Sequence, residues 1–279
     1  DLEAIEKLLL DGADPSSQIE EVGKRRYSTD EMDTPLQSAV QMRGWGKHGD
    51  DVDIVKVLLD AHKTIEKPAL SRKDWIIGSN AGWVRHEFYS RTPPFALCLE
   101  YGLVSEAKCV LEEIRDVLRG GSKYDPEGDA ARDFKDGLSD QGNNLIMRVM
   151  NGSARRGKDA CLALLELTIG IIQEIASPDM KIVMGVKDPP GTLAAHNTYK
   201  VTPLYALACG LADVTVAKML LQYGGREILS KATAPNPLAE LYVERGIGFD
   251  GQGTNTIYAK WSEDNAWTPL IAASWYGRP

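Results

Sequence analysis

Residues that build metal sites and disulfide frameworks are scarce in this sequence of 279 residues. It has four histidines, and no two of them have the i, i+3 or i, i+4 spacing that places two metal ligands on one helix face. Its four cysteines form no CxxC pair and lie in apolar stretches, which favours buried thiols in a reducing compartment. We therefore expect no bound metal and an intracellular location, with the cytoplasm first.

Signatures of catalysis are missing as well. No phosphate-binding loop, zinc-protease motif or serine-hydrolase elbow occurs, and the glycines at 246–253 lack a surrounding strand–turn–helix unit. Neighbouring carboxylates such as Glu112 and Glu113 fall on amphipathic helical stretches and look solvated rather than arranged for acid–base chemistry. These absences favour a non-catalytic protein without a cofactor.

Positive charge and long apolar runs are limited too. The net charge is −8, which argues against nucleic acid as the main partner, because phosphate binding needs a basic surface. The most apolar stretch, residues 161–172, is too short to cross a bilayer and is interrupted by Glu166. Acidic residues concentrate in residues 1–140, where they could steer a basic partner or form a plain solvated surface. We expect a protein partner, no nucleic acid and no membrane insertion.

The chain does contain a repeat. Thr-Pro-Leu occurs at residues 34–36, 202–204 and 268–270, with a near match at 92–95 and a weaker one at 143–145. Each copy is followed by small and apolar residues at helical spacing, and four copies are followed by a second apolar helix. Thr can cap the first helix at its entry, and Pro suits the first turn. Because one helix pair cannot bury its apolar face alone, the units are expected to stack.

In these motifs the sequence resembles the ankyrin repeat family. The likeness lies in Thr-Pro-Leu, in the second helices with Leu-Leu pairs, and in the helix exit Leu10-Asp11-Gly12-Ala13-Asp14. It implies an all-α helical repeat solenoid, here a single array over residues 1–279. The expected units are a partial repeat 1–32, repeats that begin near 33, 91, 142 and 201, and a partial repeat 266–279. Gly12 and Gly224 are expected at helix ends, where φ is often positive.

The spacing of the units departs from that family. Successive starts are 58, 51, 59 and 66 residues apart, whereas the family period is about 33 residues. Long loops are therefore expected between repeats. The chain is also expected to be a fragment of a longer array, with apolar side chains facing water near both ends: Leu8, Leu9, Leu10, Leu270, Ile271 and Trp275.

One insertion, residues 66–90, has a pattern of its own. Trp75-Ile76-Ile77 and Trp83-Val84 flank a segment with two glycines, which predicts a β-hairpin. Two interpretations of its tryptophans stay open. They could anchor a partner, since Trp and Tyr are favoured at interfaces, or they could cover the flank of the array itself. The same choice applies to Trp45.

The resemblance implies a protein–protein interaction scaffold that binds through its first helices and projecting loops. Two alternatives stay open: a regulatory or anchoring region of a larger enzyme or channel, and a structural subunit fixed in a large assembly. The candidate partner-binding residues are Ser38, Gln41, Met42, Trp45, Trp75, Trp83, Phe88, Tyr89, Leu99, Glu100, Ala206 and Cys209.

Overall fold

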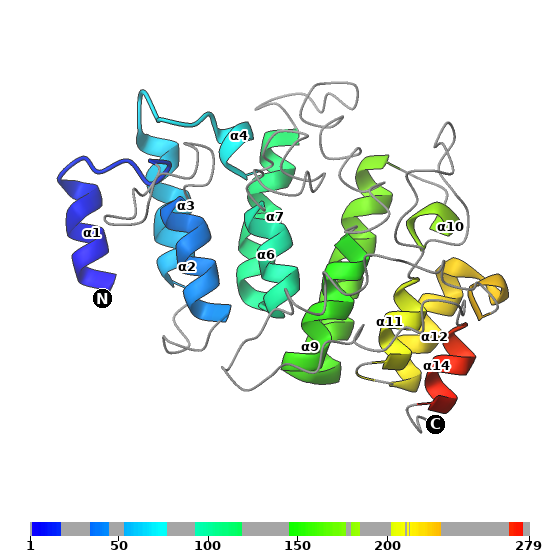
Figure 1. The fold of residues 1–279 in the computed structure, drawn as a ribbon. Coiled ribbons are helices and arrows are strands. Elements are labelled where there is room, and N and C mark those ends of the chain that lie inside the picture. The colour runs from blue at the N-terminus through cyan, green and yellow to red at the C-terminus, as the bar shows by residue number, and fades with distance from the viewer. Residues whose placement is uncertain are drawn as a thin grey trace, which may run out of the picture. The chain divides into compact units, whose positions relative to one another are not determined.

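A computed structural model describes part of the chain (Figure 1): residues 2–17, 34–44, 53–76, 93–118, 145–176, 180–184, 202–209, 211, 213–229 and 268–275. These ranges are mostly helical and contain no strand, which confirms the all-α class for the described part of the chain. Most of the expected loops between repeats lie outside these ranges. The chain divides into two compact units, one of residues 1–140 with 174–176, the other of residues 141–173 with 177–279.

The first unit has two layers of helices. Its elements are α1 (Leu2–Leu10), α2 (Pro35–Gly44), α3 (Asp53–Thr64), α4 (Arg72–Ile76), α6 (Pro94–Tyr101) and α7 (Val104–Leu118). The short helices α2 and α6 pack side by side, and each packs against the helix that follows it, α3 or α7. In the second layer α3 packs between α1 and α7, and the short α4 leans on α7. Within each layer, a helix therefore packs on the adjacent helices of the same layer.

In the second unit, too, a short first helix packs on the helix that follows it and on another short helix. Its elements are α9 (Leu145–Ala176, whose last three residues count with the first unit), α10 (Met180–Val183), α11 (Pro203–Cys209), α12 (Val214–Gly224), the 3₁₀ turn η2 (Arg226–Leu229) and α14 (Pro269–Trp275). α11 packs against α12 and against α14, while α12 packs against α10 and η2. Within α9, Gly157 has φ +80° and ψ −175°, so two helices meet there. This break falls where a first and a second helix were expected to join.

Threonine sets the start of three first helices, as its position in the repeat predicts. Thr34 and Gln37 form a capping box, because the Gln37 side chain accepts from the Thr34 N–H at 2.9 Å and the Gln37 N–H donates to Thr34 Oγ1 at 3.4 Å. Thr202 Oγ1 accepts from the Tyr205 N–H at 3.2 Å, and Thr268 Oγ1 accepts from the Ile271 N–H at 3.3 Å. Proline holds the first helical position each time.

The fourth start is shifted by one residue from the expected register. The N-cap of α6 is Pro93, with no side-chain cap, and the helix begins at Pro94. Phe95 then lies two residues after the cap, as Leu36 and Leu204 do in α2 and α11. All three side chains are buried, which shows that the apolar position defines the register better than the letters Thr-Pro.

Glycines have two roles in the described helices: some adopt a positive φ at a helix end, and others leave room for a close neighbour. Gly12 ends α1 with φ +92°, as expected. Gly224 is the last residue of α12, as expected, but the positive φ lies at the next residue, Gly225. Gly224 is buried, with Ile228 Cδ1 3.0 Å from the position that a Cβ would take. A Cβ on Gly44 would come within 2.3 Å of the Tyr101 ring, so α2 and α6 meet closely at their C-terminal ends.

The first arm of the expected β-hairpin is not a strand. Trp75 and Ile76 belong to α4, where the Trp75 N–H donates to Ser71 O at 2.9 Å. Both side chains are buried. Residues 77–92, which include Trp83, lie outside the described residues.

Candidate functional site

Helix α2 has one buried face and one accessible face. Leu36, Gln37 and Val40 are buried. The opposite side carries Ser38 and Gln41, which are half-buried, and Met42, whose exposed fraction is 36%. These three residues, spaced i, i+3 and i+4, define the α2 accessible face. Three of the predicted partner-binding residues therefore lie together where a partner can contact them.

Apart from Trp75, which is described below, the other predicted residues divide into three groups. Glu100 on α6 is half-buried. Leu99 and Ala206 were wrongly expected at the surface: their exposed fractions are 0% and 1%, because α6 packs between α2 and α7, and α11 between α12 and α14. Four residues lie outside the described residues: Trp45, Trp83, Phe88 and Tyr89. Cys209 lies in α11, but its side chain is not described.

Trp75 is an internal residue and does not serve as an exposed anchor. Its exposed fraction is 3%, and its ring stacks on His62 with centroids 4.2 Å apart and planes 16° apart. His62 is itself buried, with Nε2 3.1 Å from the carbonyl oxygen of Leu70. For Trp75 this supports the second interpretation, in which the insertion covers the flank of the array.

The exit of α1 is tied to the segment that follows α3. The Asp14 carboxylate accepts from the Ser16 N–H at 2.8 Å, from Ser16 Oγ at 2.7 Å and from the Ala69 N–H at 2.5 Å. Ser16 Oγ in turn accepts from the Leu70 N–H at 3.1 Å. Burial alone would raise the pKa of Asp14, but the hydrogen bonds from Ser16 and Ala69 outweigh it, and the pKa lies below 3.8.

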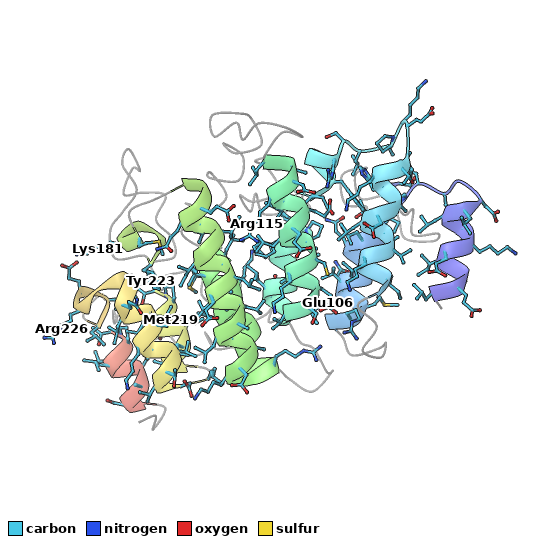
Figure 2. All side chains as sticks on the ribbon, turned by 180° about the vertical axis from the view of Figure 1, so that it is seen from behind. Glu106, Arg115, Lys181, Met219, Tyr223 and Arg226 are labelled. Atoms are coloured by element: carbon cyan, nitrogen blue, oxygen red, sulfur yellow. The ribbon has the colours of Figure 1, made fainter. Side chains whose placement is uncertain are left out.

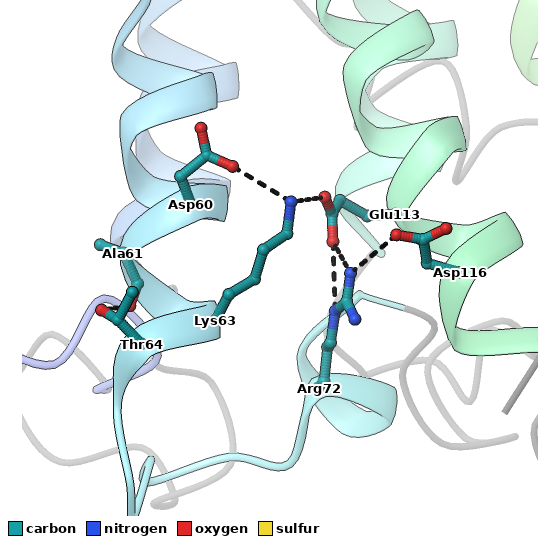
Figure 3. A network of polar contacts seen from close by, with 7 residues as sticks. All are labelled: Asp60, Ala61, Lys63, Thr64, Arg72, Glu113 and Asp116. Carbon is teal, nitrogen blue, oxygen red and sulfur yellow. Dashed lines mark hydrogen bonds and ion pairs between the residues drawn. The ribbon is translucent and has the colours of Figure 1, made fainter. Parts of the chain in front are cut away.

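Glu113 on α7 joins three helices (Figure 3). Its carboxylate is 2.5 Å from Lys63 Nζ on α3 and accepts from Arg72 on α4, whose Nε lies 3.1 Å away. Arg72 also reaches Asp116 at 3.4 Å. The hydrogen bond to Glu113 raises the pKa of Lys63 above 10.5. Two cations from two different helices therefore share the Glu113 carboxylate.

The expectation that Glu112 and Glu113 are both solvated is half right. Glu112 is exposed, but the side chain of Glu113 is only 8% exposed. The physical reason is the helical angle between neighbours, which turns Glu113 toward α3 and α4 while Glu112 faces water. Sequence spacing offers no signal for this pairing, since Lys63 and Arg72 lie 50 and 41 residues before Glu113.

A second ion pair joins the two layers of the first unit. Arg43 Nε, at the end of α2, donates to Glu106 Oε1 near the start of α7 at 2.8 Å, and the Glu106 side chain is 3% exposed. Glu106 is labelled in Figure 2. Arg115 further along α7 pairs with Glu174 at 2.9 Å. In the second unit Lys181 pairs with Glu227 at 2.7 Å. The pair of Arg43 with Glu106 fixes the end of the helix that carries the α2 accessible face.

Three cysteines can be placed. Cys98, Cys109 and Cys161 form no disulfide; Cys98 and Cys161 are buried and Cys109 is half-buried. Burial raises the pKa of Cys98 well above 9.0 and that of Cys109 above the same value. Both groups are therefore held as thiols at neutral pH, so neither has the thiolate of a reactive cysteine.

The described residues contain neither a metal-ligand cluster nor a helix that could cross a membrane. No cluster of three or more His, Cys, Asp or Glu side chains suited to a metal ion occurs among them. None of the helices described is both long and apolar enough to span a membrane. Comparison with known proteins adds no relative: no family model, no curated protein and no solved structure matches this chain.

Proposed function

We propose that this chain is a non-catalytic protein-binding scaffold of the ankyrin repeat type, and that it binds its partner through the α2 accessible face. The observation that carries the proposal is the division of α2. Its buried face is fixed by the capping box, by Leu36 and Val40 and by contact with α3 and α6. Its other face presents Ser38, Gln41 and Met42.

The helix contacts support the ankyrin-like architecture. Short first helices pack side by side, as α2 does with α6 and α11 with α14, and each of α2, α6 and α11 packs against a longer second helix. Threonine caps recur at Thr34, Thr202 and Thr268. Such stacks present extended binding surfaces, because every unit adds one more helix to the same layer.

The chemistry of the α2 accessible face fits a protein partner with an apolar anchor. The thioether of Met42 is polarizable and adapts its shape, so it can fill an irregular apolar contact. Ser38 and Gln41 supply a hydroxyl and an amide for hydrogen bonds at the rim. The buried thiols of Cys98 and Cys161 favour action in a reducing compartment, and we include the cytoplasm in the proposal.

The proposal is tested by a quantitative pull-down with purified chain as bait. Wild type is compared with Met42→Glu and with Gln222→Glu, a matched variant that places the same charge on an exposed position of α12. We expect a specific partner to be retained by wild type and by Gln222→Glu, and to be reduced at least tenfold by Met42→Glu at an unchanged Tm. Equal recovery with all three baits contradicts the α2 accessible face as the binding surface.

A further inference from the structure

Helix α12 differs from other second helices at one exposed position. The second helices can be aligned on a buried residue that they share: Leu58 in α3, Val110 in α7, Leu164 in α9 and Leu220 in α12. Two residues later, three of them carry an exposed carboxylate and α12 carries an exposed amide: Asp60, Glu112, Glu166 and Gln222. The acidic side chain that the other three present to water is therefore missing from α12.

This difference leaves Lys218 without an acidic neighbour on its own helix face. Lys218 is exposed and lies four residues before Gln222, a spacing that places both side chains on one face of α12. The equivalent lysine of α7, Lys108, is also exposed and is followed at the same spacing by Glu112. The outer face of α7 is thus mixed in charge, whereas that of α12 is cationic.

Arg226 adds a second exposed cation directly after α12. It belongs to η2, which packs on α12. The neighbouring carboxylate, Glu227, pairs with Lys181 of α10 at 2.7 Å. Within the ranges that the structure describes, neither Lys218 nor Arg226 takes part in an ion pair. Both cations can therefore pair with acidic groups of another molecule.

Two larger side chains accompany these cations. Met219 and Tyr223 are spaced i, i+4 on α12, and both are half-buried, so each keeps an accessible edge. Figure 2 labels them together with Lys181 and Arg226, on α12 and on the two elements that pack on it, α10 and η2. We call Lys218, Met219, Gln222, Tyr223 and Arg226 the α12 cationic surface.

Apolar exposure alone does not distinguish this surface. Other apolar side chains are more exposed, as expected from the sequence: Leu8, Leu10, Leu270 and Ile271. Leu9 is half-buried instead, because α1 packs on α3. What distinguishes the α12 cationic surface is the combination of two unpaired cations with an accessible aromatic ring and a thioether.

We propose that the α12 cationic surface binds an acidic peptide segment of a partner protein, in which carboxylates flank an aromatic side chain. The occupant is argued from charge complementarity. Lys218 and Arg226 can donate charge-assisted hydrogen bonds to carboxylates, and the Arg226 guanidinium can do so with two parallel bonds. Tyr223 and Met219 can pack against an aromatic ring of the same segment.

The overall charge of the chain does not produce this binding. At −8 it repels an acidic segment at long range, so the attraction has to come from the local surface. The inference goes beyond the proposed function, because the α12 cationic surface belongs to the second unit and the α2 accessible face to the first.

The test is biolayer interferometry with two immobilised probes, poly-glutamate and a random copolymer of glutamate and tyrosine. We expect wild type to bind both, and the copolymer more tightly. Lys218→Glu and Arg226→Glu should each weaken binding by about fivefold, an effect that high salt reduces. Gln222→Glu restores the carboxylate of the other second helices and should weaken binding in the same direction.

Lys108→Glu is the matched control. It makes the same change of charge at the equivalent exposed position of α7, so it should bind both probes as wild type does. Tyr223→Ala and Met219→Ala should each reduce the preference for the copolymer over poly-glutamate. Circular dichroism confirms that each variant is folded, and the exposed Lys218 and Arg226 variants are not expected to unfold the chain.

Other results overturn the inference. A wild-type chain that binds neither probe at physiological salt has no surface for acidic segments. Equal weakening by Lys108→Glu and Lys218→Glu shows a response to net charge alone. Binding to phosphatidylserine vesicles without binding to either probe assigns the surface to an anionic membrane instead. Met42→Glu should bind both probes as wild type does, and Gln222→Glu leaves the α2 accessible face unchanged, so the two proposals can fail separately.

Discussion

The indole ring of Trp75 lies on the imidazole ring of His62, with ring centroids 4.2 Å apart and planes inclined by 16°. Trp75 comes from α4 and His62 from α3, so this stack holds the start of the 66–90 insertion against the helix before it. Glu113 acts at the same place by pairing with Lys63 and Arg72. The described part of the insertion is therefore built into the first unit.

Replacement of Trp75 should destabilise the fold. Trp75→Ala removes a large buried side chain and its stack with His62, so it should lower the free energy of unfolding by about 3–5 kcal/mol. Met42→Ala, at an accessible position, should change it by less than about 0.5 kcal/mol. Urea denaturation followed by circular dichroism measures both. A Trp75→Ala variant as stable as wild type contradicts the buried stack.

The two neighbouring glutamates of α7 should respond differently. Glu113→Gln removes the carboxylate shared by Lys63 and Arg72, whose side chains are 38% and 35% exposed. Solvent screens these pairs in part, so we expect a loss of about 1–3 kcal/mol. Glu112→Gln is the matched control and should be close to neutral, because Glu112 is exposed. The comparison is made by thermal unfolding at low and high salt. Equal melting temperatures for the two variants would speak against the network in Figure 3.

Asp14 should contribute stability that depends on pH. Its pKa in the folded chain lies below 3.8, so its contribution is present above the unfolded value and is lost as the pH falls through the folded value. Asp14→Asn should therefore be less stable than wild type at pH 7, by about 1–2 kcal/mol. The difference should shrink as the pH falls below about 3.8. Urea titrations from pH 7 to pH 3 measure it, and a difference that stays constant contradicts the assigned hydrogen bonds.

Replacement of two helical glycines by alanine should change the stability of the fold in opposite directions. Gly44→Ala brings a Cβ within 2.3 Å of the Tyr101 ring and should cost about 1–3 kcal/mol. Gly170→Ala, inside α9, has no heavy atom within 4 Å of the new Cβ and should stabilise the chain by about 0.5–1 kcal/mol. In a Gly44→Ala, Tyr101→Ala double variant the cost should be less than additive. Full additivity would show that α2 and α6 do not meet at these residues.

The sequence allowed the local features to be predicted but not the long-range ones. Helix starts at Pro35, Pro203 and Pro269 follow from the threonine cap before each proline, which acts within one turn. α4 was missed, because Trp75 and Ile76 have high strand propensity and their packing on His62 and α7 decides their state.

Burial at the candidate site was the least predictable property. Ser38, Gln41 and Met42 are less buried than Leu36 and Val40, as the spacing of the apolar positions of α2 indicates, and their role in binding stays a prediction. Leu99 and Ala206 were misplaced, because their side chains are buried where α6 packs on α2 and α7 and where α11 packs on α12 and α14, and the sequence of one helix does not specify which of its sides its neighbours cover. The ion pairs of Glu113 with Lys63 and Arg72 were missed, because the sequence of α7 does not show which helices pack on it.

The central claim is that a partner protein binds the α2 accessible face, and site-specific photo-cross-linking tests it most directly. A benzophenone amino acid is placed at position 42, or at position 56 on the exposed side of α3 as the control, and the cross-linked products are identified by mass spectrometry. We expect one partner to be captured at position 42 and not at position 56, and its capture to be reduced by Gln41→Ala. Capture of the same proteins at both positions, or of none at position 42, contradicts the claim.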